Sequence, residues 1–369
     1  MKTKKITLFQ LFMLVVQTQV GVGILSLPYL LFLGAGKDGW ISLLIGGMVI
    51  QFVLLLYYFL LKKYPEKSLY EVFLLLFGNK AGKLFVLLYA AYFVAIGILI
   101  VVQFERIISR WVLPETPSWV IGLILVFLAA YLAKESLVII SRYDVLVSPF
   151  LLIIIVFIAF SLKDANLMFI MPIGQEGIMN MILTSKDAMI ALLGFEIFFF
   201  GAGLAEGTPK KKLRSGVIGV LFVTLLYLYV TFVCYIYFSP QELPLVPEPV
   251  LYLLKSFTFR VIERTDLLFL SLWVVFIHNT LVIYLYLSST GITHLRKKKK
   301  SHSKYIFLPS ICLFIGSLFV GMKDNEVTAF SKYLSYGSYA FVFFIPIAVI
   351  LISLFMKKKD GDQVASKNT

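Results

Sequence analysis

The sequence has few of the residues that build most catalytic and metal sites. Its 369 residues include only two cysteines, Cys234 and Cys312, and three histidines. Each cysteine lies alone in an apolar segment, so the spacing offers neither a disulfide framework nor a metal site, and we expect both to be packing residues. No Ser, His and Asp grouping falls at a shared depth, and no phosphate-cradling glycine loop appears. The sequence therefore predicts no enzyme, no metal and no cofactor.

Charge is also scarce. Only 15% of the residues are charged and 60% are hydrophobic, whereas soluble domains have about 25% charged residues. This composition excludes a soluble globular domain and predicts an all-α integral membrane protein. The net charge of +14 would suit a nucleic-acid partner, but basic residues in such a chain first serve to hold loops in the cytoplasm. We therefore expect no nucleic acid to bind.

Long apolar runs divide the chain into candidate membrane spans. Most are close to the roughly 20 residues that a bilayer requires, and the first is too long for a signal peptide and lacks a cleavage site. The ten runs cover residues 6–33, 40–61, 84–104, 119–133, 145–162, 188–205, 217–238, 267–291, 305–320 and 333–356.

The basic residues predict the orientation of these spans. Placing both termini in the cytoplasm puts 24 of the 34 basic residues on the cytoplasmic side and spreads the other 10 over five outer loops. The four lysines at residues 297–300 fit this topology, with binding to anionic membrane lipid or to a partner as an alternative.

The first run is a poor uninterrupted helix. Gly21 and Gly23 each cost about 1 kcal/mol of helix propensity relative to alanine, and Pro28 lacks a backbone N–H. Lipid cannot satisfy the freed backbone groups, so irregular backbone at that depth lines a protein cavity. The glycines therefore indicate the floor of a binding site or, alternatively, a close helix crossing.

The sixth run carries a second interruption, Gly194-Phe195-Glu196. Ten spans divide into two halves of five in opposite orientations, predicted at residues 1–163 and 186–356, with an outer loop at 164–185 and a cytoplasmic tail at 357–369. Interruptions at matching positions in two halves are a sequence indication of a transporter's central site. We therefore expect a cavity between the first and sixth spans.

Broken helices also suggest the ligand. A helix N-terminus suits a carboxylate and a helix C-terminus suits an ammonium, so a small amino acid fits both. Glu196 is expected to be the only acid near the middle of a span, and it is a partner for the ligand ammonium, a protonatable relay or a buried hydrogen-bonding acid. His278 is either a proton or ion relay or a hydrogen bond between helices. The predicted ligand-binding residues are Thr18, Gly21, Val22, Gly23, Ile190, Gly194, Phe195 and Glu196.

Several short motifs together resemble one family. They are residues 17–28, Asp38-Gly39-Trp40, Phe104-Glu105, Leu193-Gly194-Phe195-Glu196 with the lysines at 210–212, and residues 262–264 followed by Trp273, Tyr284 and Gly291. In these motifs the chain resembles the B subunit of bacterial spore germination receptors, a branch of the amino acid, polyamine and organocation transporter superfamily.

The resemblance implies ten transmembrane helices in a five-plus-five inverted repeat whose first and sixth helices are unwound at the centre. It places Gly21, Val22 and Gly23 on one unwound segment and Gly194, Phe195 and Glu196 on the other. It also implies sensing of a nutrient germinant in the spore inner membrane, beside an A subunit and a lipoprotein C subunit. An autonomous proton- or sodium-coupled amino acid permease and a scaffolding membrane subunit are the alternatives.

Overall fold

The computed structural model describes residues 5–256, 264–296, 301–321 and 323–355. The predicted tail at 357–369, the lysines at 297–300 and residues 262–263 of the family motif lie outside these ranges. Within them the secondary structure is helical apart from one isolated bridge between Ile6 and Ala205. The α-helices are α1 (Leu8–Gln19), α2 (Gly23–Ala35), α3 (Gly39–Lys63), α4 (Leu69–Trp111), α5 (Ser118–Ala133), α6 (Leu137–Val147), α7 (Pro149–Ala159), α8 (Ile178–Ala191), α9 (Ile197–Gly201), α10 (Pro209–Tyr237), α11 (Pro249–Lys255), α12 (Thr265–Leu295), α13 (Phe307–Val320), α14 (Asp324–Ser338) and α15 (Ile345–Phe355).

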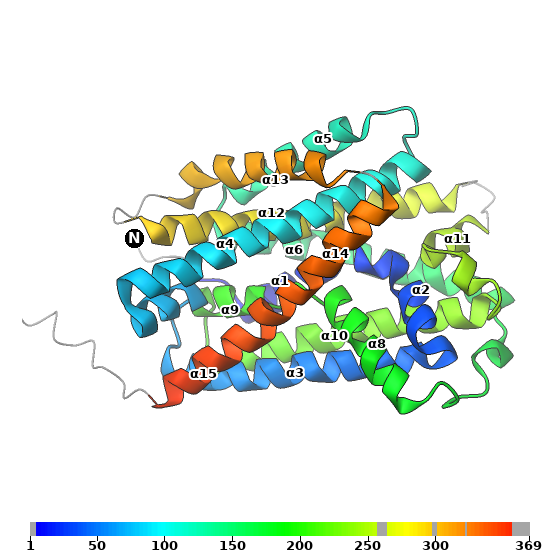
Figure 1. The fold of residues 1–369 in the computed structure, drawn as a ribbon, viewed down its shortest axis with the longest axis horizontal. Coiled ribbons are helices and arrows are strands. Elements are labelled where there is room, and N and C mark those ends of the chain that lie inside the picture. Colours follow the sequence, from blue (N-terminus) through cyan, green and yellow to red (C-terminus); the bar gives the residue numbers. More distant parts are fainter. Residues whose placement is uncertain (1–4, 257–263, 297–300, 322, 356–369) are drawn as a thin grey trace, which may run out of the picture.

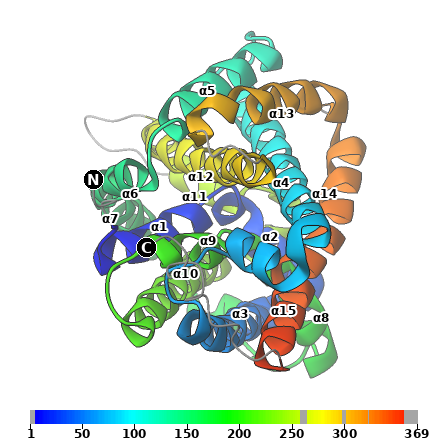
Figure 2. The same cartoon turned by 90° about the vertical axis from the view of Figure 1, so that its left-hand side faces the viewer.

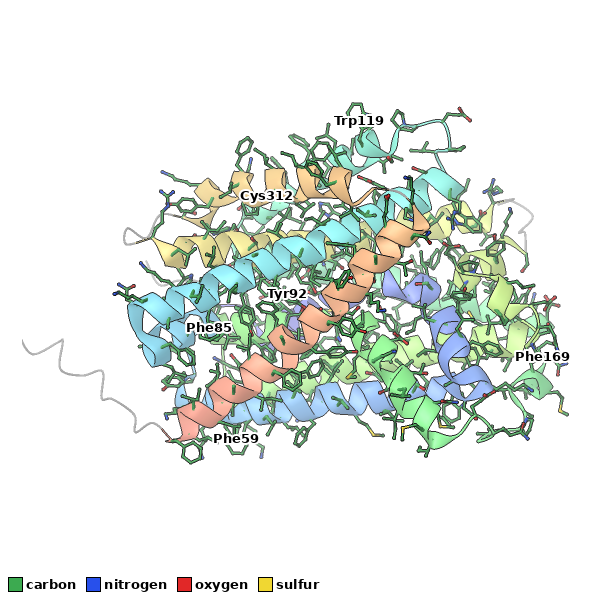
Figure 3. The ribbon with its side chains drawn as sticks, viewed as in Figure 1. Phe59, Phe85, Tyr92, Trp119, Phe169 and Cys312 are labelled. Atoms are coloured by element: carbon green, nitrogen blue, oxygen red, sulfur yellow. The ribbon has the colours of Figure 1, made fainter. Side chains whose placement is uncertain are left out.

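The long helices run along the longest axis of the molecule (Figure 1). Among the described residues, seven helical segments are long and apolar enough to cross a membrane, and α1 and α5 are shorter apolar helices. The chain is therefore an all-α membrane protein, as its composition predicts. Large apolar side chains such as Phe59 and Trp119, which are 48% and 50% exposed, point outward from the bundle (Figure 3). Cys312 is exposed on the same surface, whereas Cys234 is buried.

One end of the bundle is rich in basic residues, and we call it the basic end. Lys5 forms an ion pair with Glu66, and Lys212 donates a hydrogen bond to the carbonyl of Pro65. Lys63 bonds to the carbonyl of Ser353 at the end of α15. These contacts bring the starts of α1 and α10 and the end of α15 to the connection between α3 and α4. The helix α11 lies at the opposite end (Figure 1).

Viewed from the basic end, α1, α9 and α12 occupy the middle of the bundle (Figure 2). Helix α12 is the most enclosed of the long helices, with Trp273, Phe276 and Tyr284 all buried. The short helices α1 and α9 therefore end inside the protein, where neighbouring helices shield their freed backbone groups from lipid.

Several helix boundaries differ from the predicted runs. The element α4 begins at Leu69, where Ser68 and Glu71 form a capping box, but its backbone is not helical at Gly78 (φ 72°), so a short helix precedes the span predicted from residue 84. Helix α8 begins at Ile178, inside the predicted outer loop at 164–185. Its Thr184 and Ser185 are buried; these polar residues interrupt the apolar pattern, which is why the sequence places this boundary too late.

Candidate ligand site at two helix breaks

The first break separates α1 from α2. Helix α1 ends at Gln19, α2 begins at Gly23, and Gly21 is buried between them. The carbonyls freed at the end of α1 accept hydrogen bonds from side chains of α10 and α12. These bonds run from Tyr227 Oη to Gln19 O (2.8 Å) and from Trp273 Nε1 to Gly21 O (3.4 Å). The Thr280 hydroxyl donates to Phe276 O in its own helix at 3.0 Å, and its oxygen lies 3.4 Å from Gln17 O and 3.5 Å from Val20 O.

The second break separates α8 from α9. Between them, Gly194 has a backbone φ angle of 115°, which residues other than glycine rarely adopt. Its N–H donates to Glu196 Oε2 at 2.7 Å, and Tyr284 Oη donates to Glu196 Oε1 at 2.8 Å. Glu196 is only 2% exposed. In this conformation it is a buried hydrogen-bonding acid that satisfies the freed backbone; its roles toward a ligand or a proton stay predictions.

The two breaks touch each other. A Cβ atom on Gly194 would lie 2.5 Å from the carbonyl oxygen of Thr18, so a larger residue there has no room. Gln19 Nε2 also donates to the carbonyl of Leu192 at 2.7 Å. The end of α1 and the segment before α9 therefore form one region of irregular backbone, which is the candidate ligand site.

The predicted residues occupy different parts of this region. A Cβ on Gly21 would make ordinary contact with Thr280 Oγ1 at 3.5 Å, whereas a Cβ on Gly23 would meet Ala191 Cβ at 3.2 Å. Gly23 therefore lies where α2 and α8 cross closely, which is the alternative to a ligand contact that the sequence allows.

The other predicted residues are placed as follows. Val22 precedes the first turn of α2 and is partly buried, as is Ile190 near the end of α8. The Thr18 hydroxyl donates to Leu14 O within α1 at 2.6 Å, so only its backbone carbonyl faces the second break. Phe195 is fully buried and packs edge-on against Phe199. Among these residues, the backbone around Gly21 and Gly194 forms the centre of the site.

Comparison with known proteins identifies the family. A family model described as "Spore germination protein" matches residues 5–327, which include both breaks. The chain belongs to this family. Curated relatives are spore germination protein YndE of Bacillus subtilis (strain 168), 26% identical over 96% of this chain and 98% of the relative, and spore germination protein A2 of the same strain, 28% identical over 94% and 95%. Spore germination protein GerQB of Bacillus cereus is 23% identical over 92% of this chain and 93% of the relative.

These matches confirm the family resemblance and the role in spore germination that the sequence motifs predict.

In this spore germination protein His278 lies apart from Glu196. His278 is partly buried on α12, and its ring stands edge-on to Tyr143 of α6 with 6.1 Å between ring centroids. Glu196 instead bonds to Tyr284, further along α12. The structure does not bring the two predicted relay residues together.

The sequence reasoning missed a buried acid, Asp144 on α6. Asn279 Nδ2 donates to its Oδ1 at 2.6 Å, and Gln17 Nε2 donates to its backbone carbonyl at 3.3 Å. Its Oδ2 is buried with no hydrogen-bond partner in the described part of the chain. Asn279 is next to Thr280, which lies beside the first break, so Glu196 is not the only acid near the middle of a span.

The periodicity of α6 could have revealed Asp144. The apolar run that predicts the fifth span begins at residue 145, because Ser141, Arg142 and Asp144 interrupt the pattern before it. The buried residues of α6 nevertheless recur at helical spacing, as Leu137, Ile140, Ser141, Asp144 and Val147.

Proposed function

We propose that this chain is the membrane subunit of a nutrient germinant receptor and that it binds a small amino-acid-like germinant at the two helix breaks. The observation that carries the proposal is the geometry of the first break, where the C-terminal carbonyls of α1 and the N-terminal turn of α2 lie within one short segment. The two ends of an amino acid carry the charges that these two helix ends favour.

The start of α2 provides the carboxylate side of the proposed site. Gly23 and Ile24 occupy its first turn, where backbone N–H groups have no partner within the helix. Val22, before them, makes no side-chain capping hydrogen bond. Uncapped N–H groups together with the helix dipole favour an anion, and the germinant carboxylate is the anion we propose.

The end of α1 provides the ammonium side. Trp273 reaches Gly21 O at 3.4 Å, which is long for a hydrogen bond, and the Thr280 hydroxyl, which bonds to Phe276 O, lies 3.5 Å from Val20 O. A ligand ammonium at these carbonyls would replace weak neutral contacts with charge-assisted bonds, each worth about 1.5–3 kcal/mol. The Trp273 bond keeps the Gly21 carbonyl satisfied when no germinant is bound.

The same proposal includes the membrane arrangement. We propose ten spans in two halves of five, with α1–α2, α3, α4, α5 and α6–α7 in the first half and α8–α9, α10, α12, α13 and α14–α15 in the second; the seven long apolar segments support this count. The clustering of Lys5, Lys63 and Lys212 at one end supports cytoplasmic termini. The family resemblance supports the spore inner membrane, an A subunit and a lipoprotein C subunit.

A Gly21→Ala variant tests the site. The added methyl group makes only ordinary contact with Thr280, so the fold should persist while the space beside the Gly21 carbonyl is filled. The wild-type protein in detergent, titrated with each common amino acid, should gain thermal stability from at least one of them. In Gly21→Ala the concentration required should rise about tenfold or more, as expected for one lost charge-assisted bond.

The control is Gly337→Ala, because no atom lies within 4 Å of a Cβ at that position. Equal ligand responses of Gly21→Ala and wild type would reject the first break as the site. Amino acid uptake by liposomes that contain this chain alone would identify a permease instead, whereas co-purification with A and C subunits supports the receptor.

A further inference from the structure

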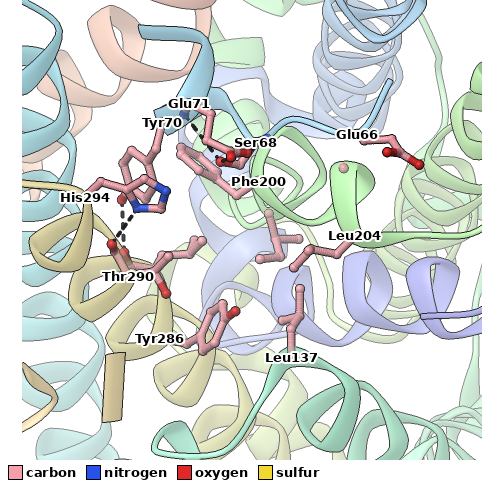
Figure 4. A pocket seen from close by; sticks show the side chains of 13 residues that line it. Glu66, Ser68, Tyr70, Glu71, Leu137, Phe200, Leu204, Tyr286, Thr290 and His294 are labelled. Carbon is pink, nitrogen blue, oxygen red and sulfur yellow. Dashed lines mark hydrogen bonds between the residues drawn. The ribbon is translucent and has the colours of Figure 1, made fainter. Parts of the chain in front are cut away.

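A second site lies toward the basic end from the second break, in a cavity of about 210 Å³ lined in part by α9. Its walls come from the start of α4, from α9 and from the last turns of α12 (Figure 4). Glu66 lies at its edge, paired with Lys5 at 2.6 Å, and both side chains are largely exposed. Because Glu66 is paired with Lys5, Glu71 is the acid in the cavity wall that has no basic partner among the described residues.

Two acceptors on the polar side of this cavity are available to a ligand. His294 Nδ1 lies 2.9 Å from the carbonyl of Thr290, which can only accept, so Nδ1 carries a hydrogen and Nε2 is the ring nitrogen left to meet a ligand. Glu71 Oε2 accepts from Ser68 N at 2.9 Å and from Ser68 Oγ at 3.3 Å. Within the described chain no group donates to Glu71 Oε1.

Aromatic rings stand beside these acceptors. The Tyr70 ring lies 4.6 Å from that of Phe200 and 5.6 Å from that of His294, measured between centroids, and all three line the cavity. A carboxylate next to aromatic faces is the arrangement that recognises an organic cation. The rest of the wall includes Leu137 and Leu204, which suit a short apolar chain.

We propose that this cavity binds a small organic ammonium ion with an alkyl chain of a few carbons. The ammonium group donates to Glu71 and His294 and lies against the Tyr70 and Phe200 rings, and the chain extends toward Leu137 and Leu204. This site is separate from the proposed germinant site, and its test does not depend on germinant binding.

Glu71→Gln tests the proposal without removing the start of α4, because glutamine also completes a capping box. The probe is butylammonium, titrated calorimetrically into the full chain in detergent, with butyrate as the anion of matching length. Butylammonium should bind the wild type saturably and butyrate should not. Glu71→Gln should weaken butylammonium binding at least about tenfold, as expected for one lost charge-assisted bond.

The matched control is Glu242→Gln. Glu242 forms the same kind of capping pair, accepting from Ser239 N at 2.9 Å, but it does not line this cavity. Glu242→Gln and Gly21→Ala should bind butylammonium like the wild type. Equal affinity in Glu71→Gln, comparable binding of butyrate, no saturable binding to the wild type, or loss of binding in Gly21→Ala would each overturn the proposal.

Discussion

The backbone groups freed at the two helix breaks find their hydrogen-bond partners in different ways. At the first break, two side chains from distant helices, Tyr227 and Trp273, donate to the carbonyls at the end of α1, and the Thr280 hydroxyl lies beside these carbonyls. At the second, Glu196 reaches back only two residues to the Gly194 N–H. The second break therefore pairs its freed N–H with a neighbouring side chain and its Leu192 carbonyl with Gln19 of α1, whereas the first depends on how α10 and α12 are placed. A ligand can therefore replace the side-chain hydrogen-bond donors more readily at the first break than at the second.

The largest effect should come from Gly194→Ala. A φ of 115° strains any side chain, and the new Cβ would lie 2.5 Å from the Thr18 carbonyl. We expect the free energy of unfolding to fall by roughly 3 kcal/mol or more, seen as a lower midpoint of thermal unfolding in detergent. Gly337→Ala, in open surroundings within α14, should not destabilise the fold, since alanine is the better helix former; equal stability of the two variants would show that the breaks do not touch.

The next effect should come from Glu196→Gln. The amide presents one oxygen and one NH₂ group where the acid accepts from both Gly194 and Tyr284, so one donor loses its acceptor. The free energy of unfolding should fall by about 1–3 kcal/mol. Tyr284→Phe should cost less, because the carboxylate keeps its bond to Gly194. A Glu196→Gln protein that is present at normal level and keeps its germinant response would assign Glu196 to structure alone.

Trp273→Phe should distinguish the first break from the second. It removes the indole N–H that reaches the Gly21 carbonyl at 3.4 Å, with little loss of stability because this bond is long. If a germinant ammonium takes that carbonyl, removing the competing donor should tighten binding about 2- to 10-fold. The measurement is the amino acid concentration at half-maximal thermal shift. Weaker binding in Trp273→Phe would mean that the indole itself contacts the ligand.

The smallest effect should come from the exposed Lys5–Glu66 pair, which calibrates the buried contacts. The hydrogen bond and charge of Lys5 lower the pKa of the Glu66 carboxyl. Because the folded pKa lies below the unfolded value, the pair stabilises the fold above the unfolded pKa and ceases to do so as pH falls through the folded one. Lys5→Ala should leave the unfolding midpoint unchanged at neutral pH. A shift as large as that of Glu196→Gln would contradict this ranking.

The sequence could predict the membrane class, the family and the regions of irregular helix. The composition and the long apolar runs predict a helical membrane protein directly, because a lipid bilayer admits few backbone structures other than helices. Glycines with Pro28 and the Gly194 segment indicate where helices stop, because local propensity is enough for that. Such features depend on residues close together in the chain.

The partners of the breaks could not be predicted in the same way. Whether Gly23 faces a ligand or another helix depends on α8, which begins far away in the chain and carries Ala191 to that position. Asp144 was missed because a hydropathy run ends at polar residues, even when a helix continues through them and buries one face. Which side chains meet at a break is a property of the assembled bundle.

The close crossing at Gly23 is one of several along α8. Gly34 of α2 packs against Thr184, and a Cβ on Gly46 of α3 would lie 3.0 Å from both the Ala188 Cβ and the Ser185 carbonyl oxygen. No long side chain separates the backbones at these points, so nothing between them can yield by changing rotamer. Helices α2, α3 and α8 are therefore packed rigidly against one another. A displacement of α2 at the first break would move α8, which leads into the second break.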